Sequence, residues 1–336
     1  TEYADLEGCD LVIEAVFEHR DIKAEVTAKT EAVIPETAIF ASNTSTLPIT
    51  GLAEASKRPQ SFIGIHFFSP VDKMPLVEII VGEKTSQEAI ARSMDYVQQI
   101  RKTPVVVNDS RGFYTSRCFG MYPNEGITML AEGVNPALIE NAAKMAGMPV
   151  GPLAVSDEVT IELQYKIMAQ HKKDLGDDWV KPSSYDAVTR FVEDLDRKGK
   201  RFGKGFYDYP ESEKKHLWGE LGTIFPAAAE QPSVDEVQKR LLYIQSLETA
   251  RCIEEGVVTE AADADIGSIL GWGFPPWTGG TISLIDTIGI ARFVAECERL
   301  ADAYGERFRP SPWLKAKAEN NESFYGETAE NARSAA

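Results

Sequence analysis

Short apolar runs alternate with amphipathic stretches over the first third of the chain. Five runs rich in β-branched and aromatic residues are predicted as strands: Asp10–Phe17, Ala38–Ala41, Phe62–Phe68, Leu76–Val81 and Val105–Asn108. Helical periodicity fills three of the intervals, over Ile22–Val33, Ile49–Ser56 and Ser86–Arg101. The first two runs have the apolar character of strands buried on both faces, and the strand–helix–strand order predicts a parallel sheet. We therefore expect an α/β, doubly wound domain over residues 1–109.

Beyond Arg111 strand-like runs disappear, and this half of the sequence repeats itself. Five residues recur at one constant offset: Arg117, Glu125, Glu132, Gly133 and Val134 return as Arg240, Glu248, Glu255, Gly256 and Val257. With one inserted residue, Gly147 and Pro152 match Gly271 and Pro276. Such a constant offset indicates a duplicated helical unit. We expect one helical domain with its Gly-rich linker over residues 110–209, a second over 210–326, and a disordered tail over 327–336.

Charge and cysteine content narrow the possible partners. The net charge of −17 argues against nucleic acid or an anionic membrane surface as a partner. No apolar run is long enough to span a bilayer, and no signal peptide is recognisable. The four cysteines, Cys9, Cys118, Cys252 and Cys297, lie far apart and form neither a disulfide framework nor a metal-ligand pair. We expect a cytoplasmic protein without a metal site.

A carboxylate in one strand and a histidine at the end of the preceding one are the candidate chemistry. Glu78 has apolar neighbours on both sides, so in a sheet it is at least half buried. An unpaired buried carboxylate costs several kcal/mol, and His66 is the nearest partner. Such a pair is a general base with its orienting group. A structural ion pair is the alternative, but no lysine or arginine lies nearby in sequence; Glu14 also needs a partner, which the sequence does not identify.

The segment Ser42–Ser45 precedes a predicted helix, so its hydroxyls suit both a helix cap and a substrate contact. A dinucleotide-binding sheet opens with a Gly-x-Gly-x-x-Gly turn between a strand and a helix. No such motif occurs, and Gly271–Pro276 is excluded because prolines follow its second glycine. The pattern therefore predicts a partial sheet that begins around the fourth strand of such a fold, without its first strands and glycine-rich loop.

Three motifs in this order, Asp10–Glu18, Ser42–Ser45 and His66–Pro70, resemble the L-3-hydroxyacyl-CoA dehydrogenase family. The duplicated helical half is similar to the dehydrogenase portion of the multifunctional fatty-acid-oxidation complex α-subunit. The resemblance implies the C-terminal part of a Rossmann-like NAD-binding domain, an NAD cofactor and oxidation of L-3-hydroxyacyl-CoA to 3-ketoacyl-CoA in β-oxidation. It also implies an acyl-CoA substrate, a thiolase subunit as partner, a homo- or hetero-oligomer, and an enoyl-CoA hydratase portion outside this chain.

The same resemblance assigns roles to individual residues. His66 would remove the 3-hydroxyl proton, Glu78 would orient the imidazole, and Ser45 would lie between the substrate hydroxyl and the nicotinamide. Ser116 and Ser69 stand where the family has asparagines, the first at the substrate oxygen and the second at the nicotinamide amide. The implied cofactor contacts are Ala15, Val16, Glu18, Lys23, Ser45, Ser69 and Lys204. The implied substrate contacts are Ser45, Lys57 and Ser116.

Two other functions stay open at this point. The chain could be a catalytically inactive module for oligomerisation or partner docking, because the cofactor-phosphate loop is absent. It could also be a related dehydrogenase of a free 3-hydroxyacid, which needs an arginine clamp for the carboxylate. Only Arg58 lies close in sequence to Ser45 and His66. Saturable NAD binding would separate the enzyme from the inactive module.

Overall fold

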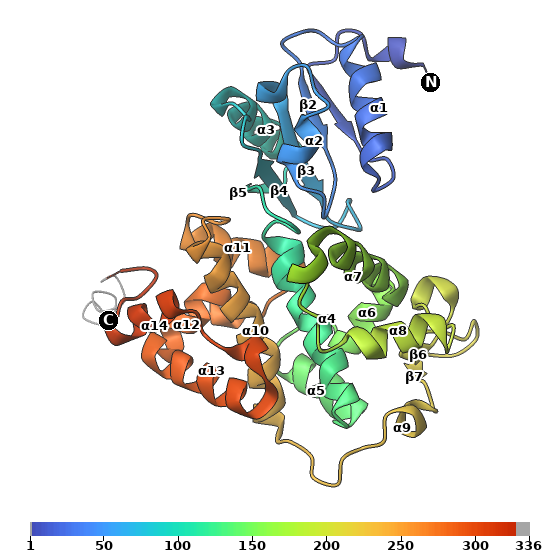
Figure 1. Cartoon of the computed structure of the whole chain (residues 1–336), viewed down its shortest axis with the longest axis vertical. Coiled ribbons are helices and arrows are strands. Elements are labelled where there is room, and N and C mark those ends of the chain that lie inside the picture. The colour runs from blue at the N-terminus through green and yellow to red at the C-terminus, as the bar shows by residue number, and fades with distance from the viewer. Residues whose placement is uncertain (1, 327–336) are drawn as a thin grey trace. The chain divides into compact units, whose positions relative to one another are not determined.

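The computed structural model describes residues 2–326 (Figure 1), so the tail predicted over 327–336 lies outside the described residues. The chain forms two compact units built from interleaved segments. Unit 1 comprises Thr1–Cys118, Glu248–Ala295 and the chain from Pro310 onward, and unit 2 comprises Phe119–Leu247 and Glu296–Arg309. The three consecutive domains expected from the sequence therefore stay a prediction.

A five-stranded sheet in unit 1 confirms all the predicted strands. Its order follows the sequence: β1 (Leu11–Glu14), β2 (Ile39–Ser42), β3 (Phe62–Phe67), β4 (Leu76–Val81) and β5 (Thr103–Asn108). Three neighbouring pairs are parallel, but β3 and β4 are antiparallel, so the expectation of a wholly parallel sheet is wrong at this pair. The reason is the short connection over residues 68–75. Parallel strands need a crossover of about a dozen residues or more.

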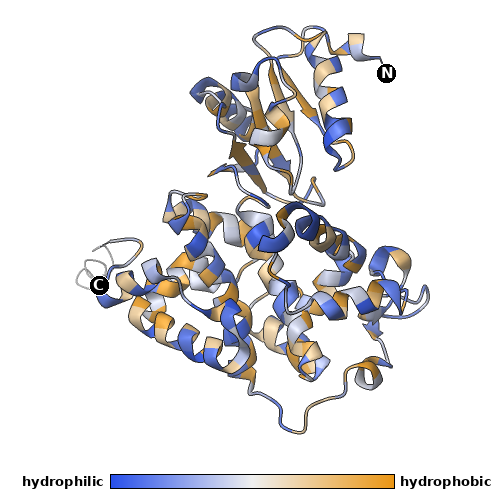
Figure 2. Ribbon diagram, in the orientation of Figure 1, coloured by the Kyte–Doolittle hydropathy of each residue, from blue (hydrophilic) through white to orange (hydrophobic). Residues whose placement is uncertain are grey.

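Helices cover both faces of this sheet, and Figure 1 shows it lying between α1 (Arg20–Glu31) and α3 (Gln87–Gln99). One face packs on α3 through a fully apolar cluster that contains Ile63, Ile65, Val77 and Ile79, and the hydrophobic strands stand out in Figure 2. Because side chains alternate along a strand, the residues between these point to the other face.

Gly64, His66 and Glu78 occupy that other face of the sheet. It is covered by α2 (Ile49–Ala53), whose Ile49 lies so close that a Cβ on Gly64 would come within 2.9 Å of its Cδ1. The alternation that fills the core against α3 thus places the histidine and the carboxylate together on the opposite face.

The remainder of the described chain is helical, as predicted, apart from a short hairpin of β6 (Tyr207–Asp208) and β7 (His216–Leu217). The helices are α4 (Thr115–Ala131), α5 (Pro136–Met145), α6 (Pro152–Val159), α7 (Ile161–Leu175), α8 (Tyr185–Glu193), α9 (Leu221–Ile224), α10 (Val234–Glu254), α11 (Ala261–Trp272), α12 (Thr281–Ile288), α13 (Ile290–Tyr304) and α14 (Pro312–Glu319).

The repeated arginines and glutamates form reciprocal ion pairs. In unit 1, Arg117 bonds Glu248, and its Nη1 lies 2.5 Å from Glu255 Oε2. In unit 2, Arg240 Nη2 lies 2.5 Å from Glu125 Oε1 and 2.7 Å from an oxygen of its second partner, Glu132. The arginine of each copy therefore binds the two glutamates of the other copy. Reciprocal contacts of this kind are those of an isologous interface, which explains why these residues recur in the sequence.

A second repeated feature escaped the sequence analysis. In unit 2, the buried Asp157 accepts hydrogen bonds from the backbone amides of Phe206 (2.8 Å) and Tyr207 (2.9 Å), and the Tyr207 hydroxyl donates to Glu140 (2.7 Å). These bonds fasten the end of the first copy to its own helices α5 and α6.

Unit 1 contains the equivalent arrangement at the end of the second copy. Asp286 accepts from the backbone amides of Phe324 (3.0 Å) and Tyr325 (3.1 Å), and the Tyr325 hydroxyl donates to Asp265 (2.6 Å). The spacing between the acids and the Phe-Tyr pair differs from that of the first copy, so a constant-offset comparison could not reveal it. The structure thus extends the duplication to the end of the described chain.

The Asp157 cluster predicts a pH dependence of local stability. Burial raises the pKa of Asp157 to about 6 and also raises the pKa of Glu140. Between the ordinary aspartate pKa of about 4 and about pH 6, the folded state binds more protons than the unfolded state, so stability falls as the pH rises through this window. From Asp157 alone we expect about 1 kcal/mol more stability at about pH 5 than at about pH 7. Hydrogen exchange of the Phe206 and Tyr207 amides at the two pH values measures this difference in local stability.

The control for this prediction is Asp157→Asn, which keeps the size of the side chain and removes the titration. The pH dependence of the opening free energy is expected to shrink in this variant. An Asp157→Asn protein with the same pH dependence as the parent would contradict the assignment.

Candidate active site

The dyad expected from the sequence is present in unit 1. His66 on β3 and Glu78 on β4 are direct cross-strand partners, and His66 Nδ1 lies 3.0 Å from Glu78 Oε2. Their side chains are 8% and 0% exposed. An ionised carboxylate can only accept, so it holds the ring proton on Nδ1 and leaves Nε2 as the basic nitrogen.

Glu78 is also held by the start of helix α4. Its Oε1 accepts from the backbone amides of Tyr114 and Thr115, both at 3.0 Å, and its Oε2 accepts from the Thr115 hydroxyl at 2.7 Å. The N-terminus of a helix favours a negative charge, so these three donors stabilise the carboxylate in a site without water access. The sequence analysis missed Thr115. No pattern in the sequence around Thr115 indicates this contact.

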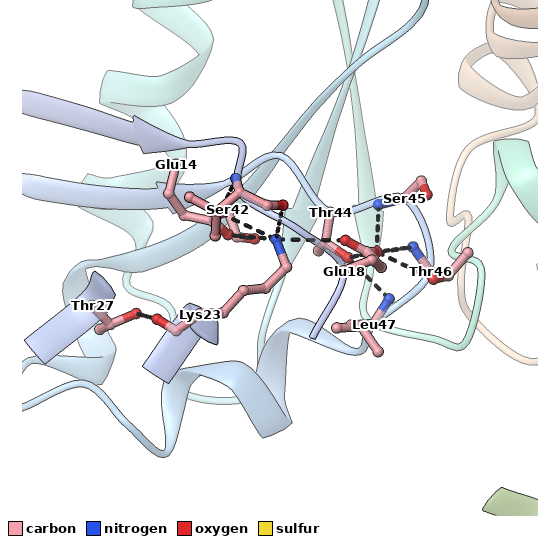
Figure 3. Close-up of polar contacts among 10 residues, drawn as sticks. Glu14, Glu18, Lys23, Thr27, Ser42, Thr44, Ser45, Thr46 and Leu47 are labelled. Atoms are coloured by element: carbon pink, nitrogen blue, oxygen red, sulfur yellow. Dashed lines mark hydrogen bonds and ion pairs between the residues drawn. The ribbon is translucent and has the colours of Figure 1, made fainter. Parts of the chain in front are cut away.

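The loop that carries Ser45 is tied to the carboxyl ends of β1 and β3. Asn43 Oδ1 accepts from the Phe67 amide at 2.8 Å, and Glu18 Oε1 accepts from the Ser45 amide at 3.2 Å. Thr44 Oγ1 accepts from the Leu47 amide at 3.0 Å, within the loop that precedes α2. Figure 3 shows the Ser45 side chain pointing away from the Glu18 carboxylate. The expected cap of α2 by a hydroxyl of Ser42–Ser45 is wrong, because its N-cap is Pro48 and the Ile49 and Thr50 amides donate to Asp109 instead.

Comparison with known proteins gives the family. Residues 1–110 match the model described as 3-hydroxyacyl-CoA dehydrogenase, NAD binding domain, and residues 112–209 match the model of the C-terminal domain. The chain belongs to the 3-hydroxyacyl-CoA dehydrogenase family. The resemblance inferred from the three motifs is thereby confirmed, as is the α/β domain followed by helices.

One curated relative in the family is the fatty acid oxidation complex subunit alpha of Shewanella amazonensis, 41% identical over 331 residues. The match covers 97% of this chain and 46% of the relative, so the chain spans about half of that protein's length. Among solved structures, the dehydrogenase part of multifunctional enzyme 1 from C. elegans has a TM-score of 0.66 and 28% identity, covering 93% of this chain and 72% of that one. (S)-3-hydroxybutyryl-CoA dehydrogenase from Ralstonia eutropha has a TM-score of 0.59 and 34% identity, covering 63% and 74%.

Two serines expected at the site, Ser69 and Ser116, are close to dyad residues in the sequence. Ser116 is the second residue of α4, directly after Thr115, and is half-buried. Ser69 is exposed just beyond β3, two residues before Val71. Ser69 follows His66 by three residues, and Ser116 follows Thr115, whose hydroxyl bonds Glu78.

Of the two lysines predicted as site residues besides Lys23, Lys57 is not brought to the dyad within unit 1. The exposed Lys57 follows α2 and leads back to the amino end of β3, whereas His66 lies toward the carboxyl end. Its backbone amide donates to Glu31 at 2.8 Å, at the end of α1. Lys204 belongs to unit 2, where its Nζ lies 3.1 Å from Asp196 Oδ2.

The remaining cofactor candidates surround the end of β1. Ala15 and Val16 directly follow the strand, and Glu18 faces the Ser45 loop. Lys23 on α1 is buried, and its ammonium contacts Glu14 and Glu18 (Figure 3). The carboxyl ends of parallel strands are where α/β sheets bind their ligands, so these residues lie at the appropriate edge.

Proposed function

We propose that this chain is the dehydrogenase part of a multifunctional β-oxidation enzyme and oxidises L-3-hydroxyacyl-CoA to 3-ketoacyl-CoA with NAD. The observation that carries the proposal is the His66–Glu78 dyad, buried and oriented beside the Ser45 loop. The family membership and the relatives' names support the substrate class.

The roles of the residues follow from their donors and acceptors. His66 Nε2 accepts the proton of the 3-hydroxyl group, and Glu78 stabilises the imidazolium that forms. Bound NAD would supply the acceptor for the hydride of the carbon that carries this hydroxyl, so that a ketone would remain. Ser45 and Ser116 donate hydrogen bonds to the reacting oxygen. A serine hydroxyl has a shorter reach than the family's asparagine amide at position 116.

The residues present fit the nicotinamide end of NAD. Ala15, Val16 and Glu18 lie at the carboxyl end of β1, and the side chain between the last two, Phe17, is 82% exposed and offers an apolar face. The Ser45 side chain is directed away from the Glu18 carboxylate (Figure 3). We propose that these residues hold the nicotinamide and its ribose, and that Ser69 and Lys204 contribute further contacts. Among residues 2–326, no glycine-rich turn joins a strand to a helix at this edge.

We also propose a thiolase subunit as partner, an oligomeric assembly and a cytoplasmic location. The relatives' name, fatty acid oxidation complex subunit alpha, supports an oligomeric assembly. The four cysteines are free thiols, which agrees with a reducing compartment. Within residues 2–326, no helix has the length and apolar character needed to cross a membrane.

The direct test is turnover by the purified chain. We expect NADH to form from NAD and an L-3-hydroxyacyl-CoA, and saturable micromolar NAD binding in a titration. Absence of both would favour the inactive docking module. Preference for a free 3-hydroxyacid would favour the related dehydrogenase of such acids. Arg58, the arginine considered for its carboxylate clamp, donates instead to the carbonyl of Pro35.

Thr115 gives a subtler prediction. Thr115→Val keeps the shape of the side chain and removes only the hydroxyl that bonds Glu78. We expect kcat/KM to fall about fivefold, the equivalent of one ordinary hydrogen bond, with NAD affinity unchanged. The matched control is Thr128→Val on the same helix, whose hydroxyl bonds the Asn124 carbonyl. Equal effects of the two variants on kcat/KM would show that the Thr115 hydroxyl has no specific role.

A further inference from the structure

Tyr114 connects the start of α4 to the second copy of the helical repeat. The residue is fully buried, and its hydroxyl donates to the carbonyl of Ala264 at 2.7 Å, across 150 positions of sequence. Its ring packs edge-on against Trp272, with the two ring centroids 5.5 Å apart. Both partners belong to α11, which is part of unit 1. The side chain of Tyr114 is therefore anchored in a helix far away in the sequence.

Two glycines of α11 allow this close packing. A Cβ at Gly267 would come within 2.8 Å of Tyr114 Cε1, and a Cβ at Gly271 would come within 2.9 Å of Leu76 Cδ2, at the start of β4. Carbon atoms pack no closer than about 3.5 Å, so a larger residue at either position would push the helix away. Because the glycines are four residues apart, they lie on one face of α11. That face packs on β4 and on the start of α4.

The backbone of Tyr114 holds the carboxylate of the dyad. Its amide and that of Thr115 donate to Glu78 Oε1, both at 3.0 Å. The two residues before it, Gly112 and Phe113, have φ angles of 73° and 50°. The left-handed region is unfavourable for a bulky residue such as phenylalanine, so it persists only where the surrounding packing fixes it. The Tyr114 side chain, anchored in α11, supplies such packing directly beside Phe113.

The second copy is also bonded to the sheet at the end of β5. The Asn108 amide donates to the carbonyl of Val257 at 2.8 Å, and the Asn108 side chain donates to the carbonyl of Gly256 at 2.7 Å. Asn108 is the last residue of β5, which pairs with the strand that carries Glu78. The turn before α11 and the helix itself are thus both attached to the part of unit 1 that carries the dyad.

We infer that Tyr114 is a positioning residue, through which α11 of the second copy holds the dyad in its working geometry. The helix holds the ring and hydroxyl of Tyr114, the Tyr114 backbone holds Glu78, and Glu78 keeps the ring proton of His66 on Nδ1. The second copy then contributes to catalysis without touching the substrate. This catalytic consequence rests on the proposed function, whereas the orientation of Glu78 and His66 does not.

The first test removes one hydroxyl. Tyr114→Phe deletes the bond to Ala264 and keeps the ring. In the cofactor-free protein, we expect the amide proton shift of Thr115 and the ¹⁵N shift of His66 Nδ1 to move, because both report bonds to Glu78. In turnover, we expect kcat to fall about fivefold, the equivalent of one ordinary hydrogen bond, with KM unchanged. A loss of global stability leaves the shifts of the folded state in place, so these shifts separate positioning from packing.

The second test acts from the other side of the contact. Gly267→Ala leaves Tyr114 itself intact and improves the helix propensity of α11, but its methyl group displaces the Tyr114 ring. We expect the same two shifts to move and kcat to fall, again with KM unchanged. The matched control is Gly120→Ala in α4, where a Cβ meets no atom within 4 Å. It should change neither the shifts nor kcat.

Tyr122→Phe is the matched control for the lost hydroxyl. Tyr122 lies on the same helix and donates to the carbonyl of Val150 at 2.7 Å, within unit 2. We expect this variant to lose stability but to keep the shifts of Thr115 and His66 and the parent kcat.

Unmoved shifts in Tyr114→Phe and Gly267→Ala would overturn the inference, because α11 would then only pack against the sheet. Equal losses of kcat in Tyr114→Phe and Tyr122→Phe would overturn it as well. If Tyr114→Phe does not fold, Gly267→Ala decides by the same two shifts. Absence of turnover in the parent protein would contradict the proposed function, and the shifts of the cofactor-free protein would still decide whether α11 positions Glu78 and His66.

Discussion

His66→Gln is expected to lower kcat/KM for an L-3-hydroxyacyl-CoA by about 10³-fold, within the range typical for loss of a general base. Nδ1 of His66 is bonded to Glu78 at 3.0 Å, so Nε2 is the nitrogen of the dyad that can accept the substrate proton. A glutamine amide has no basic nitrogen. The measurement is initial-rate NADH formation at several acyl-CoA concentrations.

The control is His216→Gln, an exposed histidine in unit 2, which should leave turnover unchanged. NAD binding should also persist in His66→Gln, since the residues proposed to hold the nicotinamide lie at the end of β1 and in the Ser45 loop. If His66→Gln retains turnover within the range of the control, His66 is not the base and the proposed mechanism is wrong.

The dyad could be predicted from the sequence because it is local. His66 and Glu78 belong to consecutive strands joined by a short connection, and the cost of an unpaired buried carboxylate makes one the partner of the other. The same connection is too short for the crossover that parallel strands need, so it already requires an antiparallel pair. The strand–helix alternation in the rest of the sheet led instead to the expectation of a parallel pair. Patterns over a few residues thus identified the chemistry, and connection length would have given the correct strand direction.

Contacts between distant segments could not be predicted in this way. Thr115, at the start of α4, reaches Glu78 on β4 across 37 positions of sequence, and nothing in the pattern around either residue indicates that contact. The family resemblance implies a cofactor contact for Lys23, and the structure shows that its buried ammonium is also the missing partner of Glu14. The sequence showed that Glu14 needed a partner. Only the packing of α1 on β1 identifies it, because the choice depends on the direction in which the helix presents its side chains.

Glu78→Gln is expected to lower kcat/KM by about 10²- to 10³-fold even though His66 remains. Glu78 accepts from four donors: two backbone amides, the Thr115 hydroxyl and His66 Nδ1. A glutamine can accept only through its carbonyl oxygen, and the two backbone amides at Oε1 cannot turn away. The carbonyl therefore faces Tyr114 and Thr115, and the NH₂ group faces His66.

This arrangement reverses the histidine tautomer. An NH₂ group donates, so Nδ1 of His66 must accept and the ring proton moves to Nε2, where it blocks uptake of the substrate proton. The ¹⁵N shifts of His66 in the cofactor-free protein report the tautomer directly, apart from any activity. Glu83→Gln, at an exposed position just beyond the same strand, is the matched control and should change neither the shifts nor the rate. Unchanged ¹⁵N shifts in Glu78→Gln together with a full rate would mean that the carboxylate only packs the core, and that the orientation of His66 is set by the neighbouring rings of Phe68 and Phe113 instead.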